Sequence, residues 1–345
     1  MGCDCRNYLP SNTPRKDVEE FLIILGYVRI PRSQFTTKGA TDFLYHPDDY
    51  KYFEGIYAEV YLDKDEGLTV HTHTRIWRSR YETDFHNYTI KQLRKRFGGH
   101  FCSDNGENRY LTNESPYIDK EEAGCYQAYS RFFDNIQRAS YTIETWLSAK
   151  TDMSWSSKEV GKLAVIDLVN PLVATVNMAI PFIVSIFEDY FRSTYIALLK
   201  YSPQKEAIIR DCRIQGEDLL LLAKGEITVE DAIARSRSFQ NMKRIAQSFK
   251  ELDRNIDLYG ILQKPYRRRK KSVYDIFEEI IHLRHLIVHR AELILNYTPQ
   301  ALLRDIQTIR VGTERFYLSL IGLYGWADEH PDLHRTIKPL EYRLR

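Results

Sequence analysis

The chain of 345 residues lacks several features that would assign it to a protein class at once. It contains no internal repeat and no low-complexity tract, so a repeat protein or a disordered chain is not indicated. Its five cysteines are odd in number and mostly scattered, and Cys3 and Cys5 are too close together for a zinc knuckle. Reduced thiols in the cytosol fit this pattern best.

Targeting signals are also missing. The first twenty residues are polar and contain two prolines, unlike a signal peptide. Met1-Gly2 begins like a myristoylation site, but Arg6 stands where Ser or Thr is needed. One apolar run, 163–187, is long enough to suggest a membrane span, yet it contains residues that lipid disfavours (Asp167, Asn170, Pro171, Asn177, Pro181). We expect a buried segment of a soluble, cytoplasmic protein with no membrane partner.

The charge shows no large surplus of either sign. The formal net charge is +2, so any signal for nucleic-acid binding has to be local. Hydrophobic residues make up 43% and charged residues 28%, as in ordinary folded proteins, and the length favours two domains. The 24 tyrosines suit large half-buried surfaces and interfaces.

The first part of the chain has the pattern of a mixed α/β domain, which we place at residues 1–120. Val70, Thr72 and Thr74 alternate with His71 and His73, the period-two pattern of a half-exposed strand. We expect, in order, a helix stopped by Gly26, two strands, a basic helix stopped by Gly98-Gly99, and a loop (17–25, 55–62, 68–77, 87–97, 100–115).

The second part is helical throughout, so the predicted fold class is α+β. We expect a helical connector at 121–157 and an all-α bundle at 158–345, with the break between the two halves somewhere in 115–160. Pro181 is expected to open one helix, and Thr228 to cap another. The expected helices are 126–148, 182–200, 228–252, 273–295 and 300–325.

The most informative segment is 278–290. One apolar stripe at helical spacing precedes and crosses it (Ile276, Ile280, Leu283, Ile287), widened by Phe277, Ile281, Val288 and Leu295. Arg284, His285 and His289 are then polar groups on a helix otherwise committed to a core. Such groups are unfavourable unless they face a cleft or an interface.

These residues resemble the signature of the HEPN superfamily, which is an arginine, a polar residue, three further positions and a histidine late in a helical bundle. Arg284 to His289 fits it position by position. The segment 184–191 resembles the acidic-aromatic early helix of these domains, and 238–241 followed by Phe249 resembles their middle helix. The resemblance covers residues 160 to 330 or so.

The resemblance implies a metal-independent endoribonuclease without a cofactor, of the kind found in toxin and antiviral abortive-infection systems. Its site would form where two protomers meet, and its partners would be RNA and an antitoxin or an activating trigger. His289 would transfer a proton or hold the 2′-hydroxyl, Arg284 would stabilise phosphate charge, His285 would support them, and Glu188 would brace Arg284.

Two other interpretations of the same helix stay open. His282, His285 and His289 are spaced so that three imidazoles on one face could bind a divalent metal. Alternatively, the domain is a non-catalytic HEPN scaffold that binds a partner or a nucleotide. Arg284 and His289 lie about 140° apart around a regular helix, which favours a site composed from two chains.

A basic segment directly precedes this helix. Six of the eight residues in 264–271 are cationic (Lys264, Arg267, Arg268, Arg269, Lys270, Lys271). They are expected to contact RNA phosphates, although a run of this kind is also typical of a solvated loop.

The N-terminal half is less informative. His71 and His73 could bind a metal or begin a two-histidine phosphoesterase motif, but no second such motif follows, so exposed-face histidines are expected. No Gly-Lys-Ser/Thr follows Gly98-Gly99, which excludes a phosphate-binding loop there. From the function that the resemblance implies for the whole chain, we expect a sensing or autoinhibiting module.

Overall fold

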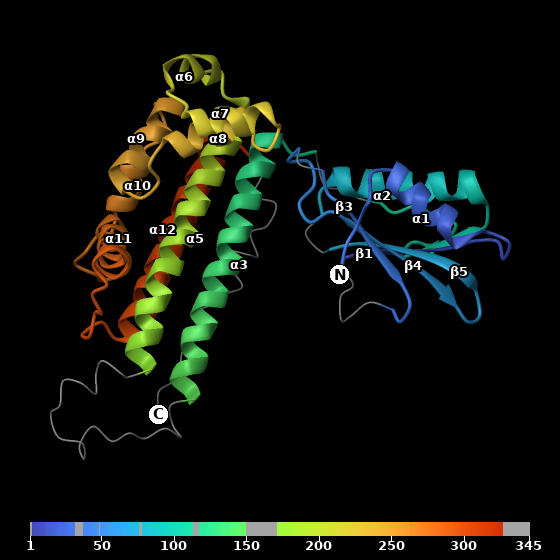
Figure 1. The fold of residues 1–345 in the computed structure, drawn as a ribbon, viewed down its shortest axis with the longest axis horizontal. Coiled ribbons are helices and arrows are strands. Elements are labelled where there is room, and N and C mark those ends of the chain that lie inside the picture. Colours follow the sequence, from blue (N-terminus) through green and yellow to red (C-terminus); the bar gives the residue numbers. More distant parts are fainter. Residues whose placement is uncertain are drawn as a thin grey trace. The chain divides into compact units, whose positions relative to one another are not determined.

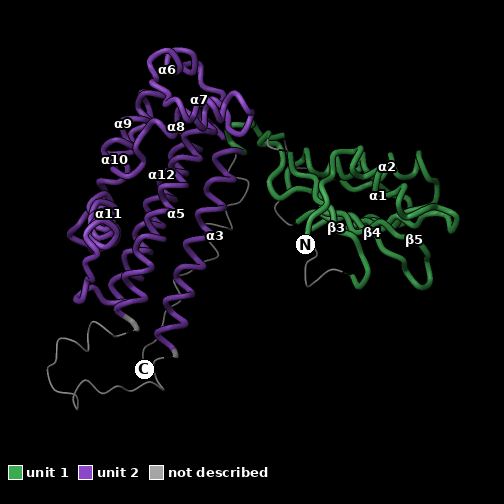
Figure 2. Tube along the Cα trace, viewed as in Figure 1, with its two compact units in different colours: residues 1–123 green, residues 124–345 purple. Residues whose placement is uncertain are grey.

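The computed structural model describes residues 2–31, 37–47, 49–75, 78–112, 117–149 and 171–326. The chain has an antiparallel sheet near its N-terminus and a helical C-terminal region, so the predicted α+β class is confirmed (Figure 1). It divides into two compact units, Met1–Ala123 and Gly124–Arg345 (Figure 2). Each unit is described by itself.

The first unit is a seven-stranded sheet in the order β2-β3-β4-β5-β1-β6-β7, with antiparallel neighbours throughout. The strands are β1 Cys3–Tyr8, β2 Val28–Arg29, β3 Thr41–Tyr45, β4 Ile56–Asp63, β5 Gly67–Thr74, β6 His100–Ser103 and β7 Gly106–Glu107. Helices α1 (Arg15–Ile24) and α2 (Arg80–Phe97) cover the same face of the sheet (Figure 1). The path β1-α1-β4-β5-α2-β6 is a split β-α-β arrangement, extended at both edges.

The predicted alternation in β5 is confirmed. Val70, Thr72 and Thr74 are buried on the face that the helices cover, while His71 and His73 are half-buried on the opposite face. We call this opposite side the open face of the sheet. The predicted end of the strand at 76–77 lies outside the described residues.

Two predictions in this unit were wrong. The basic helix begins at Arg80 instead of Asn87, because Ser79 and Glu82 form a capping box at its start. The expected loop after Gly99 contains β6 and β7. Strand β6 forms because it pairs with β1, nearly a hundred residues earlier, and local sequence does not reveal that partner.

The second unit is all-helical in its described part. Its helices are α3 Lys120–Ala149, which begins in the first unit, α5 Pro171–Tyr201, α6 Lys205–Asp211, α7 Gly216–Ala223, α8 Val229–Ser236, α9 Met242–Leu252, α10 Leu258–Gln263, α11 Val273–Arg290 and α12 Pro299–Tyr324. Most of α3, expected as part of a separate connector, belongs to this unit. The Tyr129 ring stacks on Tyr317 of α12 at 4.5 Å between centroids, and Arg131 pairs with Asp189 of α5 at 2.9 Å.

Helix α5 is the central element of the bundle, since it contacts α6, α8, α9, α11 and α12. It is long and apolar enough to cross a membrane by length and composition. It packs against five helices, so the described part of the predicted buried segment, 171–187, lies within the bundle, and 163–170 lie outside the described residues. The prediction that Pro181 opens a helix was wrong, because Pro181 lies inside α5. Buried Val176, Ile180 and Val184 continue one packed face past the proline, which offsets its missing hydrogen bond.

The expected helix 228–252 is two helices. Thr228 caps α8 as predicted, in a capping box with Asp231, but α8 ends at Ser236. Asn241 then caps α9 by accepting a hydrogen bond from the backbone N–H of Arg244 at 3.0 Å. Phe239, between the two helices, is buried and contacts Tyr195 at 5.7 Å between ring centroids. The chain therefore turns at this point to bury an aromatic side chain.

Candidate functional site

Helix α11 carries the segment Arg284 to His289, called the Arg-His motif from here on. Ser272 caps its start: the Ser272 hydroxyl accepts from the N–H of Asp275 at 3.1 Å, and the Asp275 carboxylate accepts from the N–H of Ser272 at 2.9 Å. The helix ends at Arg290, five residues earlier than predicted, where Ala291 takes the left-handed conformation with φ 52°. The motif therefore occupies the last two turns of the helix.

The predicted apolar stripe is buried only in the first half of α11. Ile276, Phe277 and Ile280 are buried, whereas Leu283 and Ile287 are half-buried and Val288 is 50% exposed. The predicted extension of the stripe to Leu295 was wrong, because that residue lies beyond the helix and is exposed. The end of α11 that carries the motif is thus the end with incompletely covered apolar side chains.

Glu188 of α5 and Arg284 of α11 are electrostatic neighbours. Glu188 is 8% exposed, and its Oε1 has no hydrogen-bond partner among the described residues. Burial raises the pKa of the Glu188 carboxyl, while the charges of Arg284 and Arg192 act to lower it. Arg284 itself is half-buried. The charge of Arg284 therefore acts on the Glu188 carboxyl, although no ion pair within 4 Å joins the two side chains in the described part of the chain, and the bracing role stays a prediction.

The two histidines of the motif lie together on the exposed side of α11. The rings of His285 and His289 are 4.9 Å apart between centroids and tilted by 46°, and both residues are exposed. The helix is regular through the motif, so Arg284 and His289 project from sides about 140° apart. A single chain therefore presents a half-buried arginine and an exposed pair of imidazoles on different sides of one helix.

The three-histidine metal interpretation gains no support. Among the described residues, one group of three metal-ligating side chains has mutually close ligand atoms, and it lies in the first unit. It does not include His282, His285 or His289. The rings of His285 and His289 lie side by side, and both imidazoles can transfer protons or form hydrogen bonds.

The basic segment divides into paired and unpaired cations. A bridge between Pro265 and Ser272 closes residues 264–271 into a loop directly before α11. Arg269 pairs with Asp305 of α12 at 2.7 Å, and Lys271 pairs with Glu279 of α11 at 2.6 Å. The other four cations are exposed and have no acidic partner within 4 Å in the described part of the chain (Lys264, Arg267, Arg268, Lys270). These four cations are therefore the ones available to bind phosphate groups.

Asp305 ties both ends of α11 to α12. It accepts from Arg269 in the basic loop, and it also accepts from the hydroxyl of Tyr297, which follows the helix. Burial and this hydrogen bond raise the pKa of the Tyr297 hydroxyl. The segments before and after α11 therefore bind the same carboxylate.

Two residues near the site were not singled out from the sequence. Arg192 lies one helical turn after Glu188 on α5 and acts on the same carboxyl, a spacing of four that the sequence does contain. Asn177, noted only as unfavourable in lipid, hydrogen-bonds the backbone of Ile294 beyond α11. No local sequence signal indicates that second contact.

Comparison with known protein families, with curated proteins and with solved structures finds no match to this chain.

Proposed function

We propose that this chain is a metal-independent endoribonuclease of the HEPN type, acting as a homodimer in the cytoplasm in a toxin or antiviral abortive-infection system. The observation that carries the proposal is the arrangement at the end of α11. The charge of Arg284 acts on the buried carboxyl of Glu188, and the exposed imidazoles of His285 and His289 lie together on a different side of the same helix.

The chemistry of these groups matches RNA cleavage through the 2′-hydroxyl. His289 takes the proton of that hydroxyl or delivers one to the leaving oxygen, because imidazole exchanges protons near neutral pH. Arg284 stabilises the extra negative charge on the phosphorus centre with its planar fork of donors. Glu188 positions Arg284, and His285 supports His289. The exposed cations of the basic loop hold the RNA backbone.

A second copy of the chain completes the site in this proposal. Arg284 and His289 diverge within one chain, so one member from each protomer brings them together across a two-fold axis. Exposed apolar side chains supply a surface for that contact: Val288 on α11 and Leu293 and Leu295 after it, with Met178 and Phe182 on α5. The hydrogen bonds from Asn177 to Ile294 hold these two segments next to one another.

One observation favours a second candidate, the non-catalytic HEPN scaffold. Arg284 has a carboxylate neighbour within its own chain, so its role is equally explained by structure alone. In that case the basic loop and the exposed apolar surface bind a partner or a nucleotide, and no bond is broken.

RNA cleavage in the presence of chelator separates the two candidates. The wild type is compared with Arg284→Ala, His289→Ala and the control His282→Ala, an exposed histidine on the same helix outside the motif. We expect cleavage by the wild type and the control, with a loss of about 10²–10⁴-fold in the two motif variants. RNA left intact by a stable wild-type dimer, with and without cell extract as a source of trigger, supports the scaffold.

A further inference from the structure

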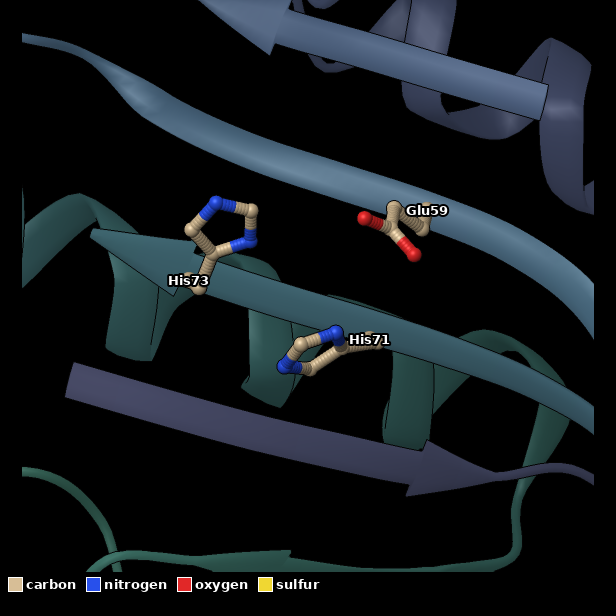
Figure 3. A group of neighbouring side chains, drawn as sticks. All are labelled: Glu59, His71 and His73. Atoms are coloured by element: carbon tan, nitrogen blue, oxygen red, sulfur yellow. The ribbon is translucent and has the colours of Figure 1, made fainter. Parts of the chain in front are cut away.

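The open face of the sheet in the first unit carries a group of side chains that the proposed function does not use. Glu59 on β4 is the direct cross-strand partner of His71 on β5. His73 is two residues further along β5 and therefore projects from the same face. All three are half-buried, and Figure 3 shows the carboxylate of Glu59 turned toward the two imidazole rings.

The distances suit a shared ion. One ligand atom from each side chain can be chosen so that all three lie within 4.8 Å of one another. A tetrahedral ion with bonds of about 2.0–2.2 Å needs ligand atoms about 3.4 Å apart. Small rotations of the side chains, within the contacts described below, would bring these atoms closer together without movement of the strands.

Neighbouring groups orient two of the three ligands. Nε2 of His71 is hydrogen-bonded to Oδ1 of Asp4 on β1 at 2.9 Å, which leaves Nδ1 for an ion. A histidine that ligates a metal usually has its other ring nitrogen on a carboxylate, which fixes the ring and increases its basicity. The hydroxyl of Thr37 donates to Oε2 of Glu59 at 3.1 Å and holds that carboxylate in place.

The third ligand is poised in the form that binds metals. Burial, together with the neighbouring His71, lowers the pKa of His73, so its ring is neutral at physiological pH. Its Nδ1 is buried and has no hydrogen-bond partner in the described part of the chain. Tyr57 stacks on the His73 ring at 5.0 Å between centroids, with planes 10° apart, and limits its rotation. An ion would satisfy this nitrogen.

We propose that Glu59, His71 and His73 bind one divalent transition-metal ion, with zinc the best match to two imidazoles and one carboxylate. Magnesium and calcium are disfavoured, because they select oxygen ligands. Three protein ligands leave at least one position for water or for an oxygen atom of a small ligand, as in open zinc sites. The proposal depends on the first unit alone and is independent of the RNA-cleaving function proposed for α11.

Zinc titration of the full chain, stripped with chelator and followed by calorimetry, tests the site. We expect one ion per chain in the wild type and in the control His100→Ala, an exposed histidine on the same face outside the group. Glu59→Gln and His73→Ala should weaken binding by more than about 100-fold, and Asp4→Asn by about 10–100-fold.

Either of two results would overturn the proposal. One is the absence of binding to the wild type, and the other is binding unchanged by Glu59→Gln and His73→Ala, which would place the ion elsewhere, such as on α11. Glu59→Gln keeps the shape of the side chain and an acceptor for Thr37, so its fold is checked by circular dichroism without metal. Cobalt substitution of the wild type adds an independent readout, since a site with nitrogen and oxygen ligands gives a visible spectrum that the same variants should lose.

Discussion

The side-chain amide of Asn177 on α5 makes both hydrogen bonds that a backbone partner would make with Ile294. It donates to the carbonyl of Ile294 at 3.1 Å and accepts from the N–H of Ile294 at 2.8 Å, across 117 residues of sequence. The amide also donates to the carbonyl of Val173 at 2.8 Å, so its donors and its acceptor are all in use. The segment after α11 is thereby attached to the first half of α5.

Replacing Asn177 should therefore lower stability. Asn177→Ala leaves the backbone groups of Ile294 without this partner and is expected to reduce the free energy of unfolding by about 1–3 kcal/mol. Denaturant unfolding measures the change. The control Ser185→Ala, at an exposed residue on the same helix, should change it by less than about 0.5 kcal/mol. Equal effects for the two variants would contradict the attachment.

Glu188 should make stability depend on pH. Because burial raises the pKa of this carboxyl in the folded chain, the folded state binds the proton more tightly than the unfolded state does. The ionised form consequently destabilises the fold above the ordinary pKa of a glutamate. Glu188→Gln should increase Tm at pH 7, and the increase should vanish as the pH falls below about 4. The control Glu206→Gln, at a side chain 87% exposed, should show no such trend.

Cations of the basic loop should differ in their effect on RNA binding. In a His289→Ala background that prevents cleavage, Arg268→Ala and Lys270→Ala should each reduce the salt dependence of affinity by about 0.7 in the log–log slope. Lys271→Ala should reduce it less, because Glu279 already neutralises that charge. Fluorescence anisotropy at several salt concentrations gives the slopes. Identical slopes for all three variants would mean that the loop is only solvated.

Asp305 should be a structural residue. Asp305→Ala removes the partner of Arg269 and of the Tyr297 hydroxyl, both held in partly buried positions, and should lower the free energy of unfolding by about 2–3 kcal/mol. The exposed pair of Lys271 and Glu279 offers the contrast, with an expected loss below about 1 kcal/mol in Lys271→Ala. Thermal unfolding compares the two variants directly.

Mixing two inactive variants tests the composite site. If Arg284 and His289 come from different protomers, a dimer of one Arg284→Ala chain and one His289→Ala chain contains one intact site. Random exchange should then restore about a quarter of wild-type RNA cleavage. If both residues act within one chain, the mixture stays inactive. The mixture must be shown to exchange subunits, by differently labelled chains.

Local sequence patterns were sufficient to predict those strands and helix starts that depend only on residues close together in the sequence. The alternation through Val70 and His71 identified β5, and Thr228 identified the start of α8. Ser79 and Glu82 also form a recognisable capping-box spacing, and a search for it would have located the start of α2.

Features that depend on distant partners were not predictable in this way. Strand β6 exists because β1 lies beside it, and Pro181 is tolerated within α5 because other helices bury the faces before and after it. The same holds for Glu59, which joins His71 and His73 only through the β4–β5 register. The sequence does not specify the register of two strands, so a group of side chains on neighbouring strands cannot be identified until the strand pairing is known.

The outermost strands of the described sheet, β2 and β7, are two residues long. Each therefore exposes only a short row of backbone donors and acceptors, too short to template another chain by strand addition. Short edge strands therefore disfavour aggregation through pairing of the sheet edges of two chains. A molecule that recognises the first unit is therefore expected to contact its side chains rather than to extend the backbone hydrogen bonding of its sheet.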